Sequence, residues 1–331
     1  MNPTAAPLKL MILLPIYNDW ECLPILLERV GRCLAGQADS VQVLLVDDCS
    51  DQPPPANLFN GNLPHISQVD CLRMRRNMGH QRAIAIGLTY IHKERECDAV
   101  LVMDADGEDK PEDAGRLVEQ LQKTGGRQVI FAERIRRSER RLFRAGYFAY
   151  RVLHRLLTGI PVRFGNFSIV PAHQLATLAV VSEAWNHYAA SVLKARIPFS
   201  CMPTNRGTRY FGKSKLNFTG LVAHGISAIA VFAEVVGVRV ILSSLALVLM
   251  ASALLLVVVG IRLFTELAIP GWATNAVGFL FVIVLQILTV AVSLTLGIFF
   301  TRNSLNFLPA RDYSYFIGEM QTLYQCRPSP A

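Results

Sequence analysis

Two long stretches without a charged residue divide this chain of 331 residues into a polar front part and an apolar rear part. Residues 240–261 are apolar at 18 of 22 positions, and residues 276–300 at 19 of 25 positions. Both stretches are long enough to cross a bilayer as helices, and a soluble core helix of that length rarely lacks charge entirely. The sequence therefore predicts a two-helix transmembrane hairpin at residues 239–301, with its spans at about 240–261 and 276–300.

Charged residues beside the hairpin predict its orientation. Arg239 precedes the first stretch and Arg302 follows the second, whereas the connector at residues 263–275 carries only Glu266. Because cytoplasmic loops are enriched in Lys and Arg, we expect both ends of the hairpin in the cytoplasm, although Arg262 counts against this orientation. The chain would then be a multi-pass protein of the cell inner (plasma) membrane, with residues 302–331 as a cytoplasmic C-terminal tail.

The segment before the hairpin, residues 216–238, holds only His224 and Glu234 as titratable side chains. Lys213 and Lys215 lie just ahead of it, which favours a juxtamembrane helical segment in the interface. A third span is the alternative, and it would move the C-terminus to the other side of the membrane. Residues 1–9 lack the basic start and apolar run of a signal peptide, so the front domain is expected to stay in the cytoplasm.

In the front part, short apolar runs alternate with helical patterns, which is typical of a parallel sheet with crossover helices. We expect an α/β domain over residues 1–215. Helices are predicted to start at Asn18 or Asp19, at Gly79 and at Pro111, where capping residues or a first-turn proline stand. The predicted strands are residues 10–14, 41–46, 69–73, 99–103 and 128–132.

Charge and cysteine content limit the partners. Only five of the 33 Lys and Arg residues and three of the 25 Asp and Glu residues follow Val238, so the front part carries a net charge of about +6. That charge suits a phosphate-rich partner or an anionic membrane surface, and on its own it suits nucleic acid equally well. The seven cysteines form no CxxC pair, which disfavours a zinc site and favours buried thiols.

Residues 127–155 contain nine arginines among apolar residues at helical spacing. This pattern predicts an amphipathic helix, and two interpretations of it are compatible. In the first interpretation the helix is a solvated surface element. In the second it is a basic surface that faces the membrane lipids or a diphosphate.

Acidic side chains follow two of the predicted strands. Asp104, Asp106 and Glu108 come directly after the strand at 99–103, and Asp47 and Asp48 end the strand at 41–46. In an open α/β sheet, ligands bind at the carboxyl ends of the strands. Alternating carboxylates there can face one hard cation, Mg²⁺ or Mn²⁺, which would bridge a diphosphate. The absence of GxGxxG and GxxxxGK[ST] disfavours a dinucleotide site or a P-loop.

At this point the chain resembles the family 2 glycosyltransferases, and within them the polyprenyl-phosphate branch that includes dolichol-phosphate mannose synthase and bactoprenol glucosyltransferases. The resemblance covers nearly the whole chain and implies a glycosyltransferase A-type, Rossmann-like domain. It rests on LLPIYND at 13–19, LLVDDCSD at 44–51, NMGHQRAIAIGL at 77–88, MDADGEDKPED at 103–113 and RGTRYFGKSKLNF at 206–218.

The resemblance also implies roles for individual residues. A metal site would use Asp104, Asp106 and Glu108, and the catalytic residues would be Asp106, Arg134, Lys213 and Lys215. Tyr17 offers a stacking face, Asp47 an acceptor, and Arg134 a cation at a strand end for the leaving diphosphate. The nucleotide-sugar would be bound by Pro15, Tyr17, Asp47, Asn77, Gly79, Asp104, Ala105, Arg209 and Ser214.

Two positions depart from the family pattern. Glu108 stands where relatives often have Gln, and Asn166 stands in Gly165-Asn166-Phe167 where many have Asp before Phe. Since Asn166 cannot take a proton, no carboxylate base can be assigned there. A polyprenyl phosphate is already anionic and needs little deprotonation, so the sequence predicts a single displacement with inversion that depends on alignment and charge neutralisation.

The expected function is therefore transfer of a hexose-type sugar from a nucleotide-sugar to undecaprenyl or dolichyl phosphate, supplying a lipid-linked donor for cell-envelope glycan modification. Relatives imply a homo-oligomer and no nucleic-acid partner. Two alternatives remain: a processive polysaccharide synthase, which normally adds a QxxRW-like motif and more spans, and a membrane-tethered nucleotide-sugar-binding scaffold without turnover. The sugar stays open among glucose, galactose, mannose, an N-acetylhexosamine and an aminoarabinose derivative.

Overall fold

The computed structural model describes residues 8–59, 61–136, 141–160, 164–212, 218–265, 271–303 and 307–326. The chain forms two compact units. The first, here called the sheet unit, comprises Met1–Gly146, Val162–Val231 and Asn306–Ala331. The second, the helical unit, comprises Tyr147–Pro161 and Phe232–Leu305.

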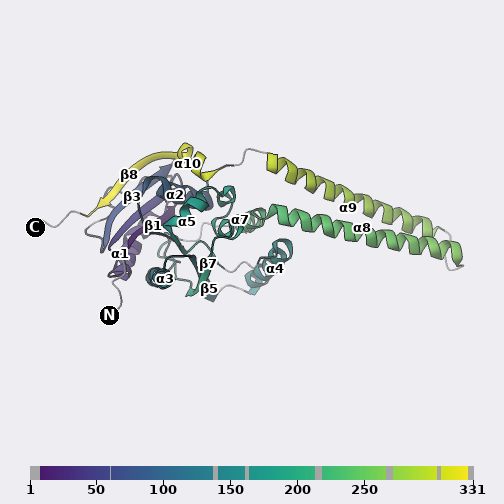
Figure 1. Ribbon diagram of the computed structural model, residues 1–331, viewed down its shortest axis with the longest axis horizontal. Coiled ribbons are helices and arrows are strands. Elements are labelled where there is room, and N and C mark those ends of the chain that lie inside the picture. Colours follow the sequence, from purple (N-terminus) through teal and green to yellow (C-terminus); the bar gives the residue numbers. More distant parts are fainter. Residues whose placement is uncertain are drawn as a thin grey trace, which may run out of the picture. The chain divides into compact units, whose positions relative to one another are not determined.

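The sheet unit is built on one mixed sheet of eight strands in the order β7-β5-β6-β4-β1-β2-β3-β8 (Figure 1). β1, β2, β3 and β4 run parallel, β5 pairs parallel with β7, and β6 and β8 pair antiparallel with their neighbours. The strands are β1 (Lys9–Ile16), β2 (Ser40–Asp47), β3 (Ile66–Met74), β4 (Ala99–Val102), β5 (Val129–Arg136), β6 (Ser168–Pro171), β7 (Phe199–Asn205) and β8 (Ile317–Gln325).

Helices cover both faces of the sheet because the central strands are apolar on both sides. In β1, Leu10, Ile12 and Leu14 pack toward α1 and α3, while Met11 and Leu13 pack toward α2, α5 and α6. This alternation follows from the two-residue period of a strand. The helices are α1 (Leu23–Leu34), α2 (His80–Glu94), α3 (Pro111–Lys123), α5 (Ala172–Ala179), α6 (Tyr188–Lys194), α7 (Phe218–Ala230) and α10 (Pro309–Phe316), with short 3₁₀ helices at Trp20–Cys22 and Ser182–Trp185.

The α/β prediction is confirmed for the first half of the sheet unit. All five predicted strands are present, and helices begin close to the predicted positions. α3 starts on Pro111, whose fixed φ and missing N–H suit the first helical position. α2 starts after Gly79, which has a φ of +91° that a residue with a Cβ adopts only with strain.

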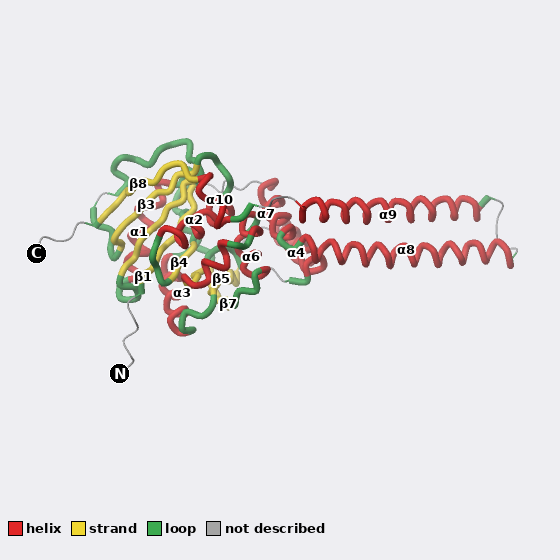
Figure 2. The backbone as a smooth tube through the Cα atoms, turned by 45° about the horizontal axis from the view of Figure 1, so that its top comes forward, coloured by secondary structure: helices red, strands yellow, loops and turns green. Residues whose placement is uncertain are grey.

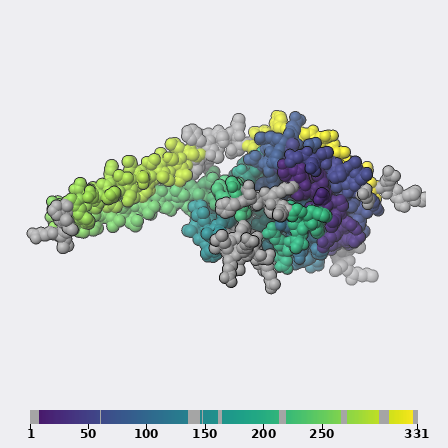
Figure 3. Space-filling view, turned by 180° about the vertical axis from the view of Figure 1, so that it is seen from behind, coloured from purple at the N-terminus to yellow at the C-terminus, as the bar shows by residue number. Residues whose placement is uncertain are grey.

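The predicted C-terminal tail needs correction. Within residues 302–331 the structure contains α10 and β8, and β8 pairs antiparallel with β3 over Gln68–Met74. Thr322 Oγ1 donates a hydrogen bond to Asp70 Oδ1 at 2.7 Å, which fixes the register on the buried side of β3. Figure 3 shows the yellow C-terminal residues against the blue residues of the sheet unit. The tail therefore contributes β8 as an edge strand of the sheet, although the other strands of that sheet come before the apolar helices in the sequence.

The helical unit contains two long apolar helices, α8 (Ala233–Phe264) and α9 (Trp272–Asn303), which pack side by side (Figure 2). Both are long and apolar enough to cross a membrane, and almost none of their surface is buried within the structure. The C-terminal half of α4 (Arg141–Thr158) also belongs to this unit. Arg239 Nη1 donates to Leu156 O at 2.7 Å, so the start of α8 caps the end of α4.

The segment predicted as juxtamembrane, residues 216–238, is divided between the units. α7 has 13 residues and lies in the sheet unit, whereas α8 begins at Ala233. A helix of 13 residues is about 20 Å long, which is shorter than the hydrocarbon core of about 30 Å.

Candidate active site

Asp47, the last residue of β2, and Asp48, which follows it, hold the loops at the carboxyl end of the sheet in place. Asp47 is 2% exposed, and its Oδ1 accepts a hydrogen bond from Ser50 N at 2.9 Å. Asp48 accepts hydrogen bonds from Met78 N at 2.6 Å and Gly79 N at 2.7 Å. Both carboxylates therefore have local backbone partners, and Asp48 fixes the start of α2 against the end of β2.

The end of β1 carries Pro15 and the loop after it carries Tyr17, and both residues were predicted to bind the nucleotide. Pro15 pairs with Val46 in the sheet. Tyr17 Oη donates to Asp51 Oδ2 at 3.0 Å, and Asn18 exchanges hydrogen bonds with the backbone and side chain of Asp51. The loops that follow β1 and β2 are thus joined at the sheet edge where ligands of this fold class bind.

The turn after β4, here called the acidic turn (residues 104–109), is held by its own carboxylates. Asp109 Oδ2 accepts from Asp104 N at 2.9 Å, and Asp106 Oδ1 accepts from Glu108 N at 2.8 Å. Gly107 has a φ of +86°, which lets the chain reverse, and Ala105 is buried. The acidic turn therefore presents Asp104 and Asp106 from a fixed backbone.

Arg134, predicted to face a leaving diphosphate, lies at the end of β5 and is paired with a carboxylate. Its Nη2 donates to Asp109 Oδ1 at 2.9 Å. Burial raises the pKa of Asp109, as does the charge of Asp104, while the guanidinium of Arg134 opposes the shift. In this structure Arg134 thus supports the acidic turn through Asp109.

Residues 206–210, here called the basic strap, follow β7 and cover the acidic turn. Gly207 N donates to Glu108 O at 2.8 Å, and Tyr210 N donates to Asp106 O at 3.0 Å. Arg206 Nε donates to Glu108 Oε2 at 2.9 Å, and Arg209 Nη2 donates to Asp106 Oδ2 at 2.7 Å. Two of the three predicted metal ligands, Asp106 and Glu108, therefore form ion pairs with arginines of the basic strap.

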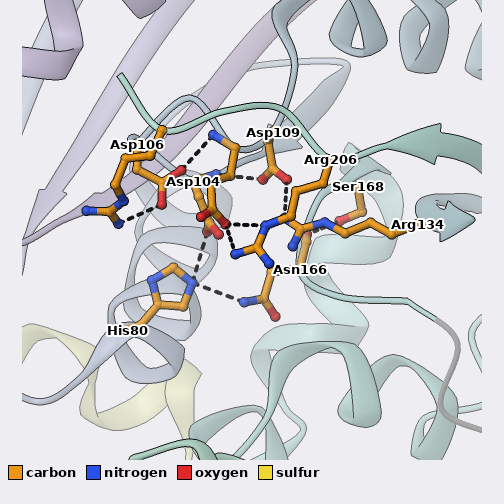
Figure 4. Close-up of polar contacts among 10 residues, drawn as sticks. His80, Asp104, Asp106, Asp109, Arg134, Asn166, Ser168 and Arg206 are labelled. Atoms are coloured by element: carbon orange, nitrogen blue, oxygen red, sulfur yellow. Dashed lines mark hydrogen bonds and ion pairs between the residues drawn. The ribbon is translucent and has the colours of Figure 1, made fainter. Parts of the chain in front are cut away.

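His80, the first residue of α2, was not predicted and stands at the centre of the site (Figure 4). Its Nε2 lies 3.2 Å from Asp104 Oδ1 and 3.0 Å from Asn166 Nδ2. Burial lowers the pKa of His80, but the negative charges of Asp104, Asp109 and Asp106 outweigh burial and raise it above its ordinary value. The sequence feature that could have indicated His80 is its position directly after Gly79, the glycine before the predicted helix, in the NMGHQRA segment.

The donor set at the acidic turn fits a hard divalent cation. Asp104 Oδ1 is buried and has His80 Nε2, 3.2 Å away, as its ion-pair partner, and burial together with the charge of Asp104 raises the pKa of Asp106. Two neighbouring carboxylates that repel one another form an environment that a cation would relieve. Among the described residues no group of three or more His, Cys, Asp or Glu side chains forms a metal cage. Mg²⁺ commonly takes only one or two carboxylates and completes its shell with substrate phosphates and water.

The remaining predicted site residues are distributed as follows. Asn77 is exposed and precedes the turn that Asp48 holds. Lys213, Ser214 and Lys215 lie outside the described residues. A cavity of about 530 Å³ opens beside the acidic turn and the basic strap, with Gly107, Lys110 and Tyr210 in its lining, but its lining does not include Asp104 or Asp106.

Close contact between the basic strap and the acidic turn gives a stability prediction. A Cβ on Gly207 would lie 2.5 Å from Gly107 O and 3.1 Å from Glu108 O. Gly207→Ala is therefore expected to force the two segments apart and lower the free energy of unfolding by about 1–3 kcal/mol, measured by thermal or denaturant unfolding. Gly146→Ala is the control, because a Cβ there meets nothing within 4 Å. Equal stabilities of the two variants would contradict this packing.

A sheet of this order, with an acidic turn after β4 and joined loops after β1 and β2, defines a glycosyltransferase A-type fold. The chain belongs to glycosyl transferase family 2, whose family model matches residues 11–176.

Curated relatives come from several bacteria. An undecaprenyl-phosphate 4-deoxy-4-formamido-L-arabinose transferase of Klebsiella pneumoniae (strain 342) is 26% identical over 228 residues, which are 65% of this chain and 64% of the relative. The protein of the same description from Erwinia tasmaniensis is 31% identical over 115 residues, 35% of this chain and 34% of its own. The uncharacterized glycosyltransferase YkcC of Bacillus subtilis (strain 168) is 24% identical over 273 residues, 80% of each chain. The matches thus span about two thirds and one third of the first two relatives.

Solved structures with a similar arrangement include glucosyl-3-phosphoglycerate synthase from Mycobacterium tuberculosis in complex with Mn²⁺, UDP-glucose and phosphoglyceric acid. It is 14% identical, with a TM-score of 0.49, and the match covers 70% of this chain and 81% of that one. A similarity of this size carries no argument about function.

Proposed function

We propose that the protein transfers a hexose-type sugar from a nucleotide-sugar to a polyprenyl phosphate at the cytoplasmic membrane face, with a divalent cation and with inversion. The observation that carries this proposal is the pair of neighbouring carboxylates Asp104 and Asp106, where the charge of Asp104 helps to raise the pKa of Asp106, at the carboxyl end of a family 2 sheet. Support for the acceptor comes from the two relatives described as undecaprenyl-phosphate transferases and from the two apolar helices of the same chain.

In this proposal Asp104 and Asp106 would hold the cation, and the cation would neutralise charge on the diphosphate of the donor. Arg206 and Arg209 of the basic strap are already beside the acidic turn, so they are placed to bind donor phosphates. The loops around Pro15, Tyr17, Asp47, Asn77, Gly79 and Ala105 would bind the nucleotide, and Arg134 would keep the acidic turn in place through Asp109.

No strong base is needed for this reaction. Asn166 cannot accept a proton. Its Nδ2 contacts His80 instead, and its Oδ1 accepts a hydrogen bond from Gln81 Nε2 at 3.2 Å. The anionic phosphate of the acceptor would attack the anomeric carbon directly, provided that the two substrates are aligned. Lys213, Ser214 and Lys215 are proposed to lie near the phosphates.

The test uses purified protein, radiolabelled nucleotide-sugars and polyprenyl phosphate, with Mg²⁺ or Mn²⁺ or with EDTA. A cation-dependent glycolipid is expected, and its anomeric configuration should be opposite to that of the donor. A polymer would indicate a processive synthase, and bound donor without product would indicate a scaffold. Retention of configuration would refute the single displacement. Cross-linking of the same preparation tests the predicted homo-oligomer.

The position of β8 in the chain supports an orientation with both ends of the hairpin on the same side of the membrane. β8 follows α9, yet it pairs with β3 of the domain that precedes α8. A chain that leaves this domain and returns to the same sheet must cross a membrane an even number of times. Two crossings by α8 and α9 satisfy this condition, whereas a third crossing by residues 216–238 would not.

Cysteine labelling tests this orientation. In intact cells a membrane-impermeant maleimide is expected to label an Ala268→Cys variant, because residue 268 lies in the connector between α8 and α9. A Glu119→Cys variant, in an exposed position of α3, is the control and should be labelled only after lysis. Labelling of Glu119→Cys in intact cells, or of Ala268→Cys only after lysis, would reverse the orientation.

A further inference from the structure

Helix α7 directly precedes the first apolar helix in the sequence and carries a single titratable side chain, His224. Its imidazole packs on that of His187, with ring centroids 4.7 Å apart and an angle of 36° between the rings. No residue in the described part of the chain makes a hydrogen bond to the imidazole of His224. A partly buried imidazole without such a partner on an otherwise apolar helix requires a reason.

His187 connects His224 to the body of the sheet unit. It is 7% exposed and caps α6, where its Nδ1 accepts from Ala190 N at 3.3 Å. The next residue, Tyr188, donates its backbone N–H to Gln81 Oε1 at 2.8 Å. The ring on which His224 packs is therefore fixed by α6, and α6 is fixed by α2.

A continuous series of contacts runs from there to the acidic turn. Gln81 Nε2 donates to Asn166 Oδ1 at 3.2 Å, and Asn166 Nδ2 lies 3.0 Å from His80 Nε2. His80 Nε2 lies 3.2 Å from Asp104 Oδ1, and Figure 4 marks this contact with a dashed line. His224 thus stands at the α7 end of a polar path that leads to the proposed cation site.

The chemistry of this path suits an anion. Between His224 and Asp104 its side chains are imidazoles and amides, and none is a carboxylate that would repel a phosphate. Burial lowers the pKa of His224, as does the charge of His80, while Asp104 opposes the shift, so the ring offers one neutral N–H donor near pH 7.

We propose that His224, held by its stacking on His187, binds the phosphate group of the polyprenyl phosphate and positions it for the transfer. The inference rests on the proposed function and names a contact of its acceptor. A purely structural stacking of the two rings is the competing explanation, and the experiments below separate the two.

The kinetic experiment compares His224→Leu, which removes the donor, with His224→Gln, which keeps an N–H group. In His224→Leu the KM for polyprenyl phosphate is expected to rise about tenfold or more, the usual effect of losing a hydrogen bond to a charged group. The KM for the nucleotide-sugar should not change, and His224→Gln should recover part of the loss. His173→Gln is the control, because His173 is exposed on α5. Equal rises in both KM values, or no rise in the KM for the acceptor, would overturn the inference.

A binding experiment does not depend on turnover. Citronellyl phosphate, a short soluble acceptor, is titrated calorimetrically into the wild type and His224→Leu in the presence of UDP and Mg²⁺, with citronellol and inorganic phosphate as separate ligands. We expect citronellyl phosphate to bind the variant about tenfold more weakly. Equal affinities would overturn the role of His224. A wild type that forms no glycolipid from any donor would refute the proposed function, and the titration would still decide the role of His224.

Discussion

Exchanging Asp104 or Asp106 for Asn is expected to lower the rate of glycolipid formation by about 10²–10³-fold or more, the range in which removal of one electrostatic group at a reacting centre falls. The amide has the shape of the carboxylate but lacks the charge that a cation requires. Asp104 and Asp106 are neighbouring carboxylates at the acidic turn, and the charge of Asp104 helps to raise the pKa of Asp106. Initial rates and calorimetric Mn²⁺ affinity should fall together.

Glu119→Gln is the matched control for these variants. Glu119 is exposed on α3 and pairs only with Lys123 at 2.6 Å among the contacts that the structure describes. Its replacement removes one negative charge from the same domain without touching the acidic turn. If glycolipid synthesis continued unchanged in both Asp variants, the proposed cation site and the function built on it would be wrong.

The second large effect is expected from loss of β8. A chain that ends after Phe316 would leave β3 as an open edge along Gln68–Met74 and would remove Ile317, Met320 and Leu323 from the two sides of the sheet core. We expect a loss of several kcal/mol out of the roughly 5–15 kcal/mol by which domains are stable, so the domain should melt much earlier or aggregate through the exposed edge.

The control for this deletion ends the chain after Cys326. It keeps all of β8, including the hydrogen bond from Tyr324 Oη to Asn62, and it should melt like the full chain. Thermal unfolding and size-exclusion chromatography in detergent compare the three proteins. If the chain ending after Phe316 melted with the other two, β8 would not belong to the folded core.

The part of the fold that could be predicted from the sequence is the part buried on both faces. β1, β2 and β4 are apolar along nearly their whole length, so they stand out as short unbroken apolar runs. β6 has only four residues, and β7 includes Pro203. β8 lies at an edge with most of its residues partly or fully exposed, so its pattern resembles that of a polar tail.

The candidate site also has a part that could be predicted from the sequence and a part that could not. Asp104 and Asp106 directly follow the apolar run of β4 in the sequence, so their position at the carboxyl end of that strand could be predicted. The pairing of those acids depends on elements distant in the sequence. His80 comes from α2, and Arg206 and Arg209 come from the segment after β7, about 100 residues later. The sequence predicted that Arg134 faces phosphates. Its pairing with Asp109 was not predicted, because this pairing is a tertiary contact that spacing does not show.

The late position of β8 has a consequence for biosynthesis. The strand that closes the sheet edge is translated after both apolar helices. Until then the nascent catalytic domain has an unpaired edge, and in the proposed topology integration of the hairpin into the lipid would return the chain to the compartment that it left. In that topology the domain is completed only when the hairpin has inserted correctly. A nascent chain with a misinserted hairpin would keep an open sheet edge that chaperones and proteases could recognise.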